Sequence, residues 1–173
     1  MSSPLSRIGR HLIAILLVAI GLFGMAGCGL FTGETPDEGG NTVEENKDLA
    51  DAVADQIADA IPEATVSINY RDDITVPATV AVTVRVPDAQ AATDAVSGEA
   101  IPAGTAFDDP ARPLAPIAVV AARLVWQSSI DPLRSLSIDV VPSGDAASGD
   151  TWNVGVSEGD SAAALTQTFG ERP

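Results

Sequence analysis

The chain has 173 residues, a length that leaves room for one ordinary domain. From Cys28 onward it holds all 24 acidic residues against 7 bases, a formal 7 − 24 = −17, whereas residues 1–27 contain Arg7, Arg10 and no acid. This excess of acid argues against nucleic acid as a partner and against attachment to anionic lipids by charge, because both need clustered Lys and Arg.

The N-terminal segment has the three-part layout of a secretory signal. Arg7 and Arg10 form a basic start, residues 12–23 form an unbroken apolar run, and small residues follow. We therefore expect residues 1–27 to be a signal peptide that is removed on export.

The end of this segment reads Met25, Ala26, Gly27 and Cys28, and Cys28 is the chain's only cysteine. These residues resemble the lipobox of bacterial lipoproteins, and the composition of the chain is similar to that of actinobacterial cell-surface lipoproteins. The resemblance covers about 28 residues. It implies that signal peptidase recognises Met25, Ala26 and Gly27 and that the Cys28 sulfur carries a diacylglyceryl group. Two acyl chains are enough to hold a protein stably on the outer side of the cell membrane.

Two alternatives to lipidation stay open. Residues 12–31 are roughly 20 uncharged residues, long enough to span a bilayer as an uncleaved anchor. Four glycines in the second half of that stretch argue against this alternative. The second alternative to lipidation is simple secretion.

Residues 28–44 are poor in apolar side chains and predict a flexible acidic tether, so we expect a single domain over 45–173. Its first element is a helix over about 45–60, in which apolar residues repeat every four positions. Asp51, Asp55 and Asp59 lie opposite that stripe, and this position is typical of an ordinary solvated helix face.

Alternating apolar and polar residues predict strands over 64–71 and 80–86, joined by a hairpin loop. Residues 87–113 follow, with four prolines and room for one short helix near 89–96. A loop of this length in so small a domain is either functional or without fixed structure.

A largely apolar helix over about 114–128 comes next, with Pro116 in its first turn, and further strands are expected around 136–140 and 152–156. A last helix ends before Gly170. The fold class is therefore α+β, a two-layer sandwich of order α-β-β-α-β(-β)-α. We expect a mainly antiparallel sheet of three to four strands with helices on one face.

The chemistry available to this domain is limited, because the only histidine, His11, lies in the signal segment. Histidine-based catalysis and His/Cys zinc sites are excluded, and no cofactor or metal site is expected. The acid pairs Asp72-Asp73 and Asp108-Asp109 lack the alternating oxygen ligands of a hard-cation loop.

These features predict a non-enzymatic, membrane-anchored envelope lipoprotein. Its domain would contact an envelope protein or polymer through the polar sheet face or the 87–113 loop. The alternative is a lipoprotein that binds a small ligand or lipid in an apolar cavity between helices and sheet.

Overall fold

The computed structural model describes residues 40–143, 149–157 and 159–173. The predicted signal peptide, the lipobox residues Met25 to Cys28 and most of the tether lie outside these ranges. The described chain forms α1 (Val43–Ala60), β1 (Thr65–Arg71), β2 (Thr79–Val86), α2 (Ala89–Ala95), α3 (Ala115–Trp126), β3 (Ser135–Pro142), β4 (Asp150–Gly155) and α4 (Gly159–Phe169). The α+β prediction is confirmed.

The sheet has the order β1-β2-β3-β4. The two outer pairings are antiparallel, as predicted, and the central pairing of β2 with β3 is parallel. The difference arises from the connection, because the chain passes through α2 and α3 between these strands. A parallel pair needs such a crossover, whereas a short hairpin loop joins only antiparallel strands.

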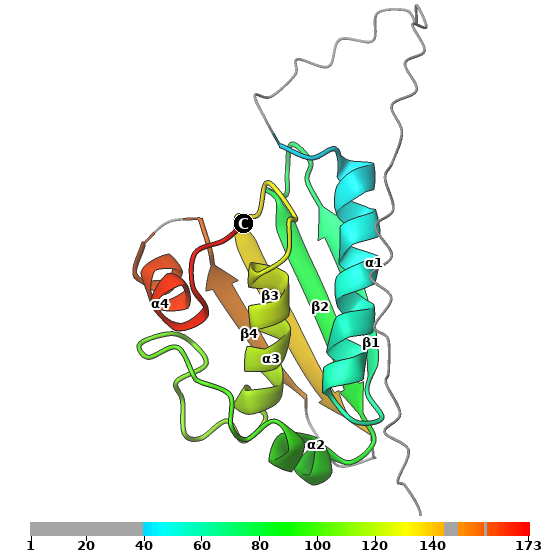
Figure 1. Ribbon diagram of the computed structural model, residues 1–173, viewed down its shortest axis with the longest axis vertical. Coiled ribbons are helices and arrows are strands. Elements are labelled where there is room, and N and C mark those ends of the chain that lie inside the picture. Colours follow the sequence, from blue (N-terminus) through cyan, green and yellow to red (C-terminus); the bar gives the residue numbers. More distant parts are fainter. Residues whose placement is uncertain (1–39, 144–148, 158) are drawn as a thin grey trace, which may run out of the picture. The chain divides into compact units, whose positions relative to one another are not determined.

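Helices cover one face of this sheet, with α1 over β1 and α3 over β3 (Figure 1). The strand side chains that point toward the helices are buried and mostly valine, and they fill the space between the two layers. Helix α3 is apolar on most of its surface, so nine of its twelve residues are buried. The buried strand residues are Tyr70, Val80, Val82, Val84, Val86, Leu136, Ile138, Val140, Trp152 and Val154.

Helix α1 begins at Val43, two residues before the expected start. Thr42 caps it, since the Thr42 hydroxyl accepts from the Glu45 amide at 3.2 Å and the Glu45 carboxylate accepts from the Thr42 amide at 2.7 Å. This capping box satisfies two backbone donors that would otherwise lack partners. It also lowers the pKa of Glu45, because the bonds from the Thr42 backbone and hydroxyl favour the charged carboxylate.

One buried polar residue ties the start of α1 to the segment before β3. Asn46 is 0% exposed. Its side-chain amide donates to the Asp131 carbonyl at 2.8 Å, and its side-chain oxygen accepts from the Asp131 amide at 3.0 Å. The Tyr70 hydroxyl donates to the adjacent Pro132 carbonyl at 3.1 Å. Together these contacts fix a segment that is distant in sequence against α1 and β1.

The C-terminal residues pack against the end of α3. The Trp126 ring nitrogen donates to the Gly170 carbonyl at 2.8 Å, and Arg172 donates to the Ile130 carbonyl. Gly170 has a φ of 87°, a left-handed conformation that ends α4 and suits glycine. Among the helices described here, none combines the length and the apolar character needed to cross a membrane.

Candidate functional site

The first candidate is the face of the sheet that carries none of the described helices. Strand alternation places one residue in two on this face, and none of these residues is buried. They are mostly short and polar, and no aromatic residue is among them. We call this set the open face: Thr65, Ser67, Asn69, Arg71, Thr79, Ala81, Thr83, Arg85, Ser135, Ser137, Asp139, Val141, Thr151, Asn153 and Gly155.

The strand register arranges the open face in rows across the sheet. Ser67, Thr83, Asp139 and Thr151 form one complete row. Within it, the Thr151 hydroxyl donates to the Asp139 carboxylate at 2.6 Å. In another row, the hydroxyl oxygens of Thr79 and Ser135 lie 2.6 Å apart. Hydrogen bonds between neighbouring strands therefore hold part of this polar surface in place.

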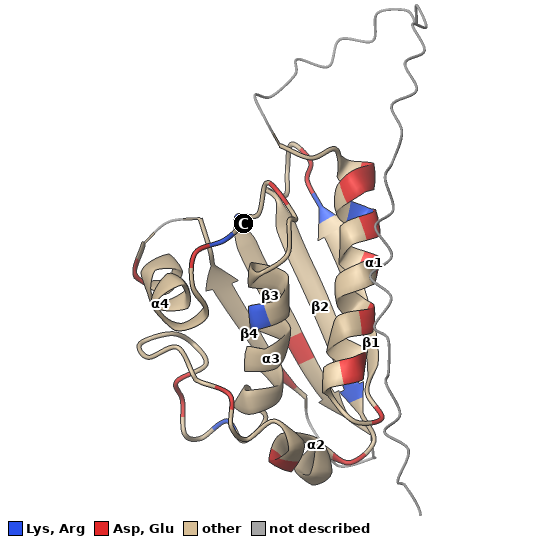
Figure 2. Ribbon diagram, viewed as in Figure 1, with Lys and Arg blue, Asp and Glu red and all other residues tan. Residues whose placement is uncertain are grey.

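The open face also differs from the rest of the domain in charge. The described residues include 7 bases and 19 acids, a formal 7 − 19 = −12. On the open face the bases Arg71 and Arg85 outnumber the single acid, Asp139, which gives +1 and leaves −13 elsewhere. Figure 2 shows the acidic residues gathered along α1 and in the loops. Another acidic molecule can therefore approach the open face with less repulsion than it would meet at the acidic surface of α1.

The second candidate is a hollow of about 390 Å³ beside the start of α3. The end of the predicted 87–113 loop supplies most of its lining, which includes Ile101, Phe107, Asp108, Asp109 and Arg112. No strand residue lines it, so it is not the cavity between helices and sheet that the ligand-binding alternative requires.

A buried aromatic pair supports this hollow from the sheet side. Phe107 and Trp152 are both 0% exposed, and their ring centroids lie 6.4 Å apart. The Arg112 guanidinium stacks 4.1 Å from the Trp152 ring centroid and donates to the Thr151 carbonyl. The Trp152 ring nitrogen is buried without a hydrogen-bond partner in the described structure. Arg112 therefore fixes the loop to β4 through its stacking and its backbone contact.

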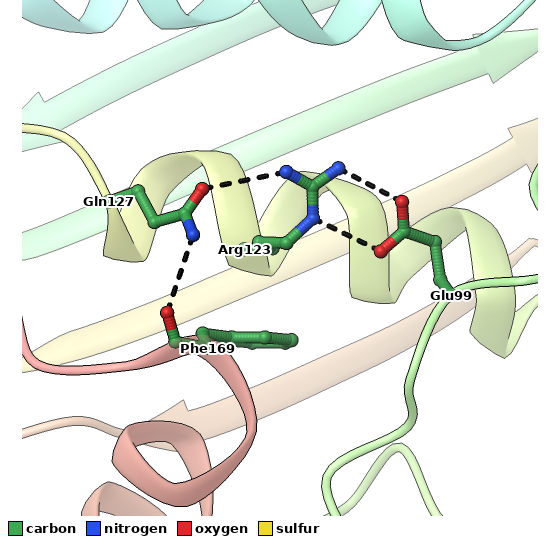
Figure 3. Close-up of polar contacts among 4 residues, drawn as sticks. All are labelled: Glu99, Arg123, Gln127 and Phe169. Carbon is green, nitrogen blue, oxygen red and sulfur yellow. Dashed lines mark hydrogen bonds and ion pairs between the residues drawn. The ribbon is translucent and has the colours of Figure 1, made fainter.

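A bidentate ion pair holds the other end of the loop (Figure 3). The two carboxylate oxygens of Glu99 accept from Nε and Nη2 of Arg123, at 3.0 and 2.9 Å. Gln127, the C-cap residue of α3, donates to the Phe169 carbonyl at 3.3 Å. The polar side of α3 thus ties both the long loop and the end of α4 to one helix. These contacts show that the loop has a defined structure over its described length.

At positions 115–117, the described first turn of α3 offers no free backbone donor for an anion. Pro116 has no amide proton, the Ala115 amide donates to the Arg112 carbonyl at 3.0 Å, and the Ile117 amide donates to the Leu114 carbonyl at 3.1 Å. A helix N-terminus binds anions through unsatisfied amides, and here those amides are already paired.

Both acid pairs from the sequence shape turns. One Asp73 oxygen accepts from the amides of Thr75 and Val76 at 2.7 and 2.9 Å. The Thr75 hydroxyl and these amides lower the pKa of Asp73. Asp108 and Asp109 accept from the amides of Gly104 and Ala111. Over the residues described, no group of three or more His, Cys, Asp or Glu side chains is placed to hold a metal ion.

The lipobox residues Met25, Ala26, Gly27 and Cys28 lie outside the described residues, so neither candidate surface includes them. No protein-family model matches the chain, and neither a curated protein sequence nor a solved structure is significantly similar to it.

Strand alternation indicated the open face from the sequence. The stacking of Arg112 on Trp152 had no sequence signal, because the two residues are far apart in the chain.

Proposed function

We propose that this protein is a cell-envelope lipoprotein, anchored by a diacylglyceryl group on Cys28 and facing outside the cytoplasm. Its domain is a non-enzymatic interaction module that binds an envelope partner through the open face of the sheet. The anchor is supported by the basic start, the apolar run and the Met25-to-Cys28 motif. The strong negative charge of the domain is consistent with attachment by lipid rather than by charge.

The open face is the observation that carries the binding proposal. A four-stranded sheet with one side covered by helices and the other bearing short polar side chains presents a broad surface without bulky obstacles. Fifteen residues from four strands share this surface, and its formal charge of +1 contrasts with −13 for the other described residues. A partner that docks there meets hydroxyl and amide groups able both to donate and to accept hydrogen bonds.

The anchor is tested with Cys28→Ala in cells. We expect the wild-type chain in the membrane fraction, with a diacylglyceryl cysteine at its mature N-terminus by mass spectrometry. Cys28→Ala should appear as full-length precursor or in the soluble fraction. A wild-type chain that keeps Met1 and a free thiol in the membrane would refute lipidation and establish the uncleaved anchor.

The binding surface is tested by crosslinking in intact cells, with photoreactive residues at exposed positions. Substitution of Asn69 or Asn153 on the open face by the photoreactive residue should give specific adducts. A matched position on α1, Asp55, should give few. Equal yields from both surfaces, or none from the open face, would refute the open face as the docking site.

A further inference from the structure

We infer that the open face binds the open face of a second copy of this chain, in a two-fold dimer that brings Arg85 of each copy beside Asp139 of the other. The inference rests on the proposed function, since it names the partner of that surface. Three observations support it: the charge of the domain, the order of the rows, and the absence of an ion pair between Arg85 and Asp139 within one described copy.

The charge of the domain selects the face by which two copies can meet. Each described domain carries −12, so most approaches between copies bring acid against acid. Two open faces, in contrast, meet with a formal charge of only +1 each, so the repulsion between them is much smaller than that between two acidic surfaces. Short side chains such as Ser, Thr, Ala and Gly also let two sheets approach to about 10 Å, the ordinary spacing of stacked sheets.

The order of the rows makes this face self-complementary. A two-fold axis parallel to the strands and midway between β2 and β3 sets β2 of one copy over β3 of the other. Each row then faces the same row of the second copy. Thr83 lies over Asp139 of the second copy, and Arg85 lies over Val141 of the second copy.

Arg85 and Asp139 supply the specific contact across this axis. Arg85 is two residues from Thr83 along β2, about 7 Å, and the stacked sheets are about 10 Å apart, so the Cα atoms of Arg85 and of Asp139 in the second copy lie about 12 Å apart. Extended arginine and aspartate side chains together span that separation. The symmetry makes the contact twice. Within one described copy, the ion pairs are Arg112 with Asp150 and Arg123 with Glu99, so Arg85 and Asp139 are not paired with each other. Asp139 accepts from Thr151, and a carboxylate has capacity for further bonds.

The size of the surface sets the expected strength of the dimer. Four strands about 4.8 Å apart and about seven residues long cover roughly 450 Å². Two copies together therefore bury roughly 900 Å² of surface, an area in the range of weak or transient complexes. We therefore expect a dissociation constant in the micromolar range or weaker. Salt screens both the repulsion between the two acidic domains and the attraction of the Arg85–Asp139 contacts, so the charge variants, rather than the salt dependence, test the contact.

The test uses the full-length chain purified from membranes in density-matched detergent, with association measured by sedimentation equilibrium. Arg85→Glu alone and Asp139→Arg alone should each raise the dissociation constant about 10-fold or more. An equimolar mixture of the two variants should recover wild-type affinity. In the mixed dimer, the acid introduced at position 85 of one variant faces the base introduced at position 139 of the other. The native Arg85–Asp139 pair forms the second contact.

Two controls separate this contact from the general effect of changing the charge. Arg134→Glu and Asp55→Arg make the same kinds of charge change at exposed positions off the open face. Neither should raise the dissociation constant as much as the open-face variants do. If the controls weaken association equally, the net charge of the domain and not the Arg85–Asp139 contact governs it, and the inferred geometry is wrong.

Each result supports or overturns the inference. Recovery in the mixture requires contact between copies, since pairing within one copy would leave both variants impaired. A wild-type chain that stays monomeric, or a mixture that fails to recover, overturns the dimer. If the dimer is overturned but open-face crosslinking yields adducts with another envelope component, the proposed function still stands. If the open face yields no adducts, the proposed function fails together with the dimer.

Discussion

Asn46 offers the sharpest test of how this fold is held together, because it is the one fully buried polar side chain among the described residues. Asn46→Ala removes the acceptor of the Asp131 amide and one of the two donors to the Asp131 carbonyl. The carbonyl keeps its second donor, the Asn41 amide at 2.9 Å. The amide of Asp131 is therefore the group left without a partner.

The expected loss of stability comes mainly from the unpaired Asp131 amide. The bond from the Asp131 amide is part-buried and Asp131 itself is exposed, so the unpaired amide costs about 1–2 kcal/mol, the lower part of the range for a buried donor, and the lost bond to the carbonyl adds about 1 kcal/mol. We expect Asn46→Ala to lower the free energy of unfolding by about 2–3 kcal/mol. For a domain of this size the melting temperature should fall by roughly 10 °C.

The measurement is urea unfolding followed by circular dichroism, with Asn69→Ala as the control. Asn69 is also an asparagine, but it is exposed on β1, so its removal should change stability by less than about 0.5 kcal/mol. If Asn46→Ala were no more destabilising than Asn69→Ala, the connection before β3 would not depend on the Asn46 contacts, and the stabilising role of this buried side chain would be refuted.

Three further predictions concern the loop, the end of α4 and the start of α1. Arg123→Ala removes the bidentate pair with Glu99 and should lower the free energy of unfolding in urea by about 1 kcal/mol, a modest loss because the two side chains are 28% and 27% exposed. The freed loop should also be cut faster by a protease that cleaves after Glu99. Unchanged proteolysis would contradict this role of the pair. Gly170→Ala should cost about 1 kcal/mol, since its φ of 87° strains a residue with a Cβ; a neutral result in thermal unfolding would contradict it. The pKa of Glu45 lies below its ordinary value of 4.5 in the folded state, so its contribution to stability is present above that value and is lost as pH falls through the folded pKa. Thr42→Val should move this pKa back toward 4.5 in an NMR titration of the Glu45 carboxyl, and an unmoved titration would show that the hydroxyl has no part in it.

The elements of this fold could be predicted from the sequence because their signals are local. Apolar residues every four positions marked α1, and alternation marked β1 and β2 to within one residue. The same alternation separated the covered side of the sheet from the open face, since a one-residue change of register would bury polar side chains. The absence of histidine and of a second cysteine after Cys28 limited the available chemistry directly.

The tertiary structure decided what depends on residues far apart in the chain. The parallel pairing of β2 with β3 follows from the path of the chain through α2 and α3, and no local pattern encodes it. The same pairing sets Thr83 beside Asp139 and so creates the rows of the open face. The stacking of Arg112 on Trp152 likewise requires that the long loop fold back onto β4. Sequence periods describe which side of an element is buried, whereas the neighbour of each side chain depends on how the elements pack.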